Sequence, residues 1–216
     1  MNLIFKLIST LLCYPTDTQQ AALADLRAAV ATVPVLKEHA SSFDKVLDYL
    51  ESRELITLQE EYVAYFDRNR SHALYLFEHL HGEDRDRGSA MVDLLEAYRG
   101  HGFDISANEL PDYLPLLLEF MAQVDETVAL SMLSDAIHVI NHLGNKLHAN
   151  HVPYAPLLTI LVHLSPVCPE PLVEPPVRDM DEAMELFGAS PEGVEPLIRP
   201  GLTQTVQFYP NRPMAQ

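Results

Sequence analysis

The chain has 216 residues, a hydrophobic fraction of 48% and a formal net charge of -17. Its length allows one large domain or two small ones, and its apolar content is sufficient for a buried core. The negative charge argues against nucleic acid, which proteins bind through Lys and Arg, and against insertion into or binding to anionic membranes. An acidic surface instead favours a basic partner, or it serves only solubility.

The first two predicted elements are helices. Residues 2–12 repeat Leu and Ile at helical spacing with Lys6 on the polar face. This pattern predicts an amphipathic helix that docks on the domain rather than a secretory signal, which needs a clean apolar run. Thr16 and Gln19 form a capping box ahead of a helix over 21–30.

Three further helices are predicted before Gly82. Ser42 is the expected cap of a helix over 43–52, and a second helix is expected over 53–67. Ser71 is expected to begin a short helix that ends at His81. The helix over 53–67 carries one apolar seam, formed by Leu55, Leu58, Tyr62 and Tyr65.

The strongest helical patterns follow. A helix over 84–99 ends before Gly100 and has one apolar stripe, formed by Met91, Leu94, Leu95 and Tyr98. The segment 113–121 is apolar nearly all round, so we expect it at the centre of the fold. A long helix over 126–147 and a last core helix over 154–164 complete the pattern. The long helix has a stripe at regular spacing: Ala129, Leu133, Ala136, Ile140, Leu143 and Leu147.

The composition changes after Ser165, because ten of the sixteen prolines lie beyond it. Such a segment can rarely bury enough apolar surface to offset its ordering entropy, so we expect an irregular acidic tail with one short helix over 179–187. The sequence therefore predicts an all-α protein. Residues 1–165 form a single helical-bundle domain of about eight or nine helices, and residues 166–216 form the Pro-rich acidic tail.

One group of residues invites a metal hypothesis. Asp135, His138 and His142 share a helix face, and Glu78 with His81 forms a Glu-x-x-His pair. A dimetal helical bundle needs several such pairs on different helices, and no second copy is present. A solvated polar face is the simpler interpretation, so we expect no metal and no resident cofactor, while a metal-dependent helical enzyme remains the alternative.

Nucleophilic and phosphate-transfer chemistry have little support. The sequence contains no G-x-S-x-G elbow and neither of the common glycine-rich phosphate loops. The two cysteines, Cys13 and Cys168, are far apart, so they indicate neither a disulfide framework nor a metal site, and reducing cytoplasm is the expected location. Cys13 ends an amphipathic helix, where we expect a buried or half-buried structural thiol. The pattern predicts a protein that is not an enzyme.

Two charged segments stand out, residues 78–88 and residues 109–120. The first concentrates alternating acids and arginines at a helix start, and the second sets acids around a very apolar helix. Helix capping explains both, with Asp112 as a plausible cap beside Pro111. A charged rim that seats a basic, apolar peptide is the alternative for the first segment, and for the second it explains the acids equally well.

The run from Glu60 to Tyr98, with the segment ELPDYLPLLLEF after it, closely resembles the dedicated assembly chaperones of respiratory nitrate reductase, the so-called delta subunits. The resemblance spans Met1 to about Ser165. The wider group of molybdoenzyme maturation chaperones is all-helical and carries a Glu-Pro-Asp-His stretch. Here Asp112 matches that stretch, whereas Tyr113 stands in place of the His.

The resemblance implies a specific role in anaerobic respiration and nitrate assimilation. Such chaperones bind the N-terminal segment of the catalytic alpha subunit in the cytoplasm and keep that subunit open until molybdenum cofactor is inserted. They also delay its attachment to the membrane. Cofactor-insertion proteins are a second class of partner that the resemblance allows. An acidic adaptor with an unrelated partner remains a further alternative.

The predicted partner-binding residues come from the apolar and the charged parts of both segments and from the helix before them. A peptide helix would place apolar side chains in a groove and basic side chains on its rim. Ordinary core packing is the alternative for each aromatic residue. His72, His79 and His81 would add positive charge near pH 6.5 and weaken a basic ligand. The candidates are Tyr65, Phe66, Phe77, Glu78, His81, Arg85, Arg87, Asp112, Tyr113, Leu116, Glu119 and Phe120.

Overall fold

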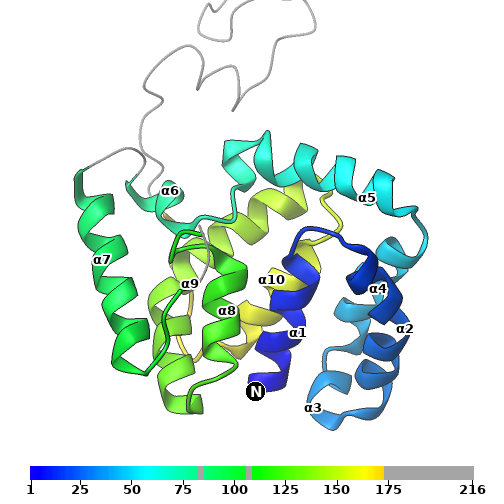
Figure 1. Cartoon of the computed structure of the whole chain (residues 1–216), viewed down its shortest axis with the longest axis horizontal. Coiled ribbons are helices and arrows are strands. Elements are labelled where there is room, and N and C mark those ends of the chain that lie inside the picture. Colours follow the sequence, from blue (N-terminus) through cyan, green and yellow to red (C-terminus); the bar gives the residue numbers. More distant parts are fainter. Residues whose placement is uncertain (82–84, 106–108, 173–216) are drawn as a thin grey trace, which may run out of the picture. The chain divides into compact units, whose positions relative to one another are not determined.

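The computed structural model describes residues 1–81, 85–105 and 109–172, coloured along the chain in Figure 1. These residues form ten α-helices, one π-helix and one 3-10 turn, with no strand among them. The all-α prediction is confirmed. The helix that the sequence did not predict is the short α3, which has four residues and begins at Pro34.

The elements in chain order are α1 (Asn2–Leu12), α2 (Asp17–Thr32), α3 (Pro34–Lys37), α4 (Ala40–Glu51), α5 (Leu55–Tyr62), the π-helix η1 (Val63–Asp67), the 3-10 turn η2 (Arg70–His72), α6 (Leu76–His81), α7 (Arg85–Gly100), α8 (Leu114–Met121), α9 (Glu126–Ala149) and α10 (Ala155–Leu164).

Helix α8 lies at the centre, as its composition predicts. It packs along α1, while α9 packs along α10, and Figure 1 shows α7 on one side of this group and α2 to α4 on the other. Six of the eight residues of α8 are buried. The contact with α1 includes a buried hydrogen bond, in which the Ser9 hydroxyl donates to the Pro115 carbonyl at 2.7 Å. This pairing fixes the register of α1 on α8.

Helix capping follows the sequence in one place and departs from it in another. The Thr16 hydroxyl accepts a hydrogen bond from the Gln19 amide at 3.2 Å, so Thr16 caps α2 as predicted. The predicted cap at Ser42 is wrong, because α4 begins at Ala40. The backbone turn after α3 already bonds the Ser42 amide to the His39 carbonyl at 3.0 Å, which places Ser42 inside the first turn.

The helix predicted from Ser71 is also different in the structure. A 3-10 turn ends at His72, and α6 begins only at Leu76. Between them the chain is extended, because it pairs with a distant segment: the Leu114 amide donates to the Leu74 carbonyl at 2.8 Å. The pairing satisfies backbone groups that a continuous helix would have used internally.

The long helix α9 buries the predicted apolar stripe except for Ala136, which is half-buried. No described helix is long and apolar enough to cross a membrane. The short helix predicted over 179–187 lies outside the described residues, as does the tail beyond residue 172, so the domain boundary at residue 165 stays a prediction. Among the described tail residues, the Glu170 amide donates to Nδ1 of His138 on α9 at 2.9 Å.

Candidate functional site

The segment 109–120 meets, in the fold, the residues that lie just before the segment 78–88. Tyr75 and Tyr113 form an isolated antiparallel bridge, and their rings lie 5.3 Å apart between centroids. The Tyr75 hydroxyl donates to the Glu109 carboxylate at 2.9 Å. The segment before α8 is therefore held against the segment before α6 by backbone and side-chain bonds together.

Asp112 is the buried centre of this junction. Its side chain is fully buried, and one carboxylate oxygen accepts a hydrogen bond from the Phe77 amide at 3.0 Å. Asp112 thus caps α6 from a distance, whereas the sequence predicted a cap for its own helix, which α8 lacks. Burial raises the pKa of Asp112, against the opposing effect of the Phe77 hydrogen bond and the Arg87 charge.

The predicted charged rim is present in part. Arg87 on α7 reaches Glu78 on α6 at 3.5 Å, and both side chains are partly exposed. A pair of this kind contributes about 0–1 kcal/mol, so it orients more than it stabilises. The side chains of His81 and Arg85, also predicted for this rim, lie outside the described part of the structure.

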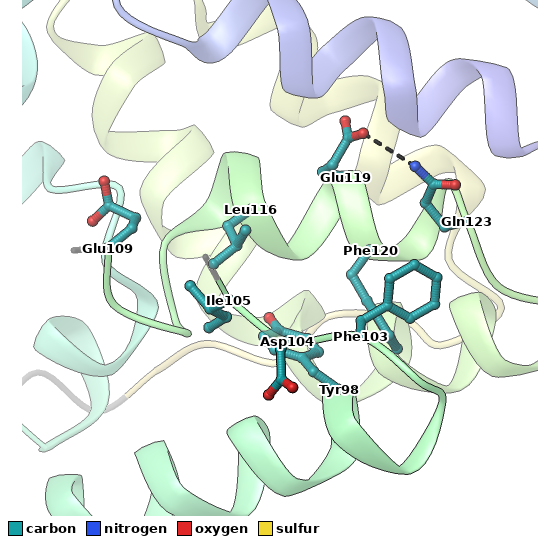
Figure 2. Close-up of a pocket in the computed structure, with 9 residues that line it drawn as sticks. All are labelled: Tyr98, Phe103, Asp104, Ile105, Glu109, Leu116, Glu119, Phe120 and Gln123. Atoms are coloured by element: carbon teal, nitrogen blue, oxygen red, sulfur yellow. Dashed lines mark hydrogen bonds between the residues drawn. The ribbon is translucent and has the colours of Figure 1, made fainter. Parts of the chain in front are cut away.

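A pocket of about 200 Å³ lies between the end of α7, the connection after it, and α8. Figure 2 shows the side chains of this α7–α8 pocket, with Leu116 and Phe120 projecting from α8 toward the connection. The lining residues are Tyr98, Phe103, Asp104, Ile105, Glu109, Leu116, Glu119, Phe120 and Gln123.

Three aromatic rings form much of the apolar part of the pocket, beside Ile105 and Leu116. Phe120 packs against Tyr98 at 4.6 Å and against Phe103 at 5.5 Å between ring centroids. Phe120 and Tyr98 are almost fully buried, whereas Phe103 is 36% exposed. The Tyr98 hydroxyl donates to the Pro111 carbonyl at 2.7 Å, which ties α7 to the segment before α8. The three rings are therefore held in place, and the Phe103 ring is the one exposed to solvent.

Three carboxylates surround this apolar surface, and each has an internal partner. Glu119 pairs with Lys6 of α1 at 2.6 Å, and Asp104 pairs with Arg99 at 2.9 Å. Glu109 accepts the Tyr75 hydroxyl described above. The pocket thus combines an apolar interior with a negative edge, an arrangement suited to a ligand that is both apolar and basic.

The structure separates the predicted partner-binding residues. Leu116, Glu119 and Phe120 line the pocket. Phe66 lies instead in a closed aromatic core, 5% exposed, and Tyr65 packs on its edge. The other candidates with described side chains, Phe77, Glu78, Arg87, Asp112 and Tyr113, belong to the junction beside the pocket and do not line it. A partner-binding role for any of these residues stays a prediction.

Several pocket residues were absent from the sequence-based set. Tyr98 was predicted only as part of an apolar stripe, and Phe103 directly follows the turn at Gly102, whose φ of 85° marks the reversal after α7. An aromatic residue just after such a helix stop is the signal that could have indicated the pocket. The residues missed are Tyr98, Phe103, Asp104, Ile105, Glu109 and Gln123.

The histidines differ from the predicted pH response. Nε2 of His79 lies 2.8 Å from the Ala73 carbonyl, and burial lowers its pKa to about 4. Burial lowers the pKa of His72 as well, and its Nδ1 lies 3.2 Å from the Tyr65 carbonyl. The prediction that these two rings take up a proton near pH 6.5 gains no support, because burial lowers the pKa of both.

The metal hypothesis gains no support from the described residues. Nδ1 of His138 accepts a hydrogen bond from the Glu170 amide, and the Asp135 side chain is exposed. In the described ranges no group of three or more His, Cys, Asp or Glu side chains is arranged to hold a metal ion. Cys13 is exposed rather than half-buried, as is Cys168.

Comparison with known proteins places this architecture in a family. A family model described as the nitrate reductase delta subunit matches residues 16–159. The chain belongs to the nitrate reductase delta subunit family. A relative in Escherichia coli (strain K12), the nitrate reductase molybdenum cofactor assembly chaperone NarJ, is 38% identical over 162 residues, which cover 74% of this chain and 68% of the relative.

Other members of the delta subunit family align over a similar range. One is the probable nitrate reductase molybdenum cofactor assembly chaperone NarW of Escherichia coli (strain K12). It is 34% identical over an alignment that covers 75% of this chain and 68% of NarW. The probable NarJ of Bacillus subtilis (strain 168) is 31% identical, covering 74% and 87%. The resemblance inferred from the sequence is confirmed. These relatives are named as assembly chaperones, and the family is not one of catalytic enzymes.

Proposed function

We propose that this member of the delta subunit family is a chaperone dedicated to respiratory nitrate reductase. It binds the N-terminal segment of the catalytic alpha subunit in the cytoplasm and holds that subunit competent for molybdenum cofactor insertion before membrane attachment. The names of the relatives support the chaperone role. The observation that carries the finer proposal is the α7–α8 pocket, which joins an apolar interior to a negative edge.

The pocket suits one or two apolar side chains of a helical or extended peptide. The half-buried Leu116 and the partly exposed Phe103 present apolar surface beside the almost buried Phe120. Covering such surface contributes about 25 cal/mol per Å² before the cost of ordering the peptide. Apolar burial therefore supplies most of the proposed affinity.

The acidic edge sets the orientation of the peptide. Glu109 and Glu119 lie at the pocket in a chain whose net charge is -17, so a basic segment is attracted and an acidic one is repelled. Exposed ion pairs contribute only about 0–1 kcal/mol each. Their effect is to select a basic, amphipathic segment and to fix its direction.

Holding the segment is sufficient for the proposed role. A segment bound in the pocket cannot occupy its place in the mature alpha subunit at the same time, so binding delays closure of that subunit. The cofactor is cargo for the alpha subunit in this scheme, and the chaperone supplies no chemistry. Cofactor-insertion proteins are the proposed second partner, acting while the alpha subunit is held open.

The direct test is calorimetric titration of the full chain with the N-terminal peptide of the alpha subunit. A peptide of the same composition in scrambled order is the control. We expect saturable one-to-one binding for the native order and much weaker binding for the scrambled one. Equal binding of both peptides, or binding of neither, would contradict the proposal.

A further inference from the structure

A lysine from another helix occupies the acidic edge of the pocket. Nζ of Lys6 on α1 lies 2.6 Å from both carboxylate oxygens of Glu119 on α8. Figure 2 shows α1 as the blue ribbon that passes beside Glu119. The side chain of Lys6 is 52% exposed and that of Glu119 is 33% exposed, so water and ligand can reach both.

We propose that Lys6 is an internal stand-in for a cationic side chain of the bound peptide. In the free chain it neutralises Glu119, and a Lys or Arg of a basic apolar segment displaces it when that segment enters the pocket. This inference rests on the proposed function and adds to it a residue that decides which peptides bind. A neutral apolar segment leaves Lys6 in place, whereas a basic one exchanges with it.

Glu119 differs from the other acids of the pocket in the origin of its partner. Asp104 pairs with Arg99, which lies five residues earlier in the last turn of α7. Glu109 accepts a bond from the neutral Tyr75 hydroxyl. The cation at Glu119 instead comes from an element that contributes no residue to the pocket lining. A ligand can replace that cation without disturbing α7 or the connection after it.

The fold allows Lys6 to leave without loosening α1. The docking of α1 depends on buried Ile4, Phe5 and Ile8 and on the bond from Ser9 to the Pro115 carbonyl of α8. The Lys6 ammonium lies at the end of a long flexible chain, which can turn into water. Gln123 donates to Glu119 at 3.3 Å, so the carboxylate keeps a second contact when Lys6 moves away.

The test compares Lys6→Gln with Lys45→Gln by calorimetric titration with the N-terminal alpha-subunit peptide. Both substitutions change the net charge equally, and Lys45 is an exposed residue of α4, on the side of the fold away from α7 in Figure 1. Loss of one exposed ion pair predicts that Lys6→Gln binds about two- to fivefold more tightly than Lys45→Gln. The gain should vanish for a peptide whose Lys and Arg residues are replaced by Gln.

A second arm removes the acid. In the Glu119→Gln background, Lys6→Gln should give no gain, because the two residues act through one contact. The amine of Lys6 should also react faster with acetic anhydride when the wild-type chain is saturated with peptide. If Lys6→Gln binds no better than Lys45→Gln, the inference about Lys6 fails and the proposed function stands. If the wild-type chain does not bind the peptide, both fail.

Discussion

Two aromatic clusters of similar composition have opposite surroundings in this fold. The rings of Tyr62, Phe66 and Tyr154 pack with centroids between 4.8 and 6.1 Å apart, edge to face where Tyr154 is involved, and all are at most 5% exposed. The other cluster comprises Tyr98, Phe103 and Phe120, and it opens through Phe103 into the α7–α8 pocket. The first cluster is buried throughout. In the second, the buried rings of Tyr98 and Phe120 support the exposed ring of Phe103.

The difference between the clusters lies in what covers them. The closed cluster joins the α5–η1 helix to the start of α10, with Tyr49 of α4 packed on Tyr154. In the open cluster, Phe103 lies on the connection that follows Gly102 and is 36% exposed. A ring covered by helices contributes to stability, whereas a ring covered by a connection can contact a partner. Phe66 and Phe120 were predicted to share one groove, but in the structure they belong to different clusters.

The largest effect is expected at the closed cluster. Phe66→Ala removes a ring that is 5% exposed and leaves a cavity, so the free energy of unfolding should fall by about 3–5 kcal/mol. Chemical denaturation measures this directly. Below the unfolding transition, peptide affinity per folded molecule should equal that of the wild type. A stable Phe66→Ala variant with lost peptide affinity would remove the distinction between the two clusters.

The next effect concerns His79 on α6, whose ring lies 6.0 Å from the His142 ring of α9 between centroids. Its pKa is about 4 in the fold and about 6.5 when unfolded. The unfolded chain therefore binds more protons between these values, and stability is lost as pH falls from 6.5 toward 4. The loss should be about 2–3 kcal/mol by pH 4.5.

His79→Gln should make this pH dependence shallower. The Gln amide can still donate to the Ala73 carbonyl that His79 contacts at 2.8 Å, but it cannot take up a proton. Thermal melts from pH 7 to pH 4.5 compare the two proteins. Parallel pH profiles would show that another group is responsible, and His72 is the next candidate because burial lowers its pKa too.

The open cluster predicts a different result at Leu116. Leu116→Gln places a polar group in the pocket at a half-buried position, so peptide affinity should fall about tenfold with a small change in stability. Ile56→Gln is the matched control, since Ile56 is 59% exposed on α5 and lies outside the pocket. Equal losses for both variants would mean that the pocket is not the binding surface.

The fold was largely predictable because helical periodicity is a local property. The stripe of α9 and the apolar α8 follow from spacing and composition alone. The role of Asp112 was not predictable in the same way. It caps α6 through Phe77, 35 residues earlier, and only the pairing of Tyr75 with Tyr113 brings the two together. Long-range pairing of short extended segments has no periodic signal in the sequence.

The candidate site shows the same limit. The sequence singled out the segment 109–120, and this segment contributes Glu109, Leu116, Glu119 and Phe120 to the pocket. It did not reveal which aromatic residues are covered by helices and which by a connection, because burial depends on how distant elements pack. Tyr98 and Phe103 therefore entered the site only through the fold.

The smallest effect is expected at Tyr113, which packs on Tyr75 and contacts the closed cluster through Tyr62. Its hydroxyl lies 3.2 Å from that of Tyr62, and Tyr62 also donates to the Leu12 carbonyl. Tyr113→Phe should cost no more than about 1 kcal/mol of stability, because Tyr62 keeps its second bond. Peptide affinity should not change. A clear loss of affinity would assign Tyr113 to the partner surface rather than to the junction.

The most direct measurement is a titration of the isotope-labelled full chain with the alpha-subunit peptide, followed by backbone amide chemical shifts. The largest shifts should occur in 98–105 and 114–123, around the open cluster, with little change near Phe66 and Tyr154. The scrambled peptide should leave the spectrum nearly unchanged. Shifts centred on the closed cluster, or the same shifts with both peptides, would contradict binding in the α7–α8 pocket.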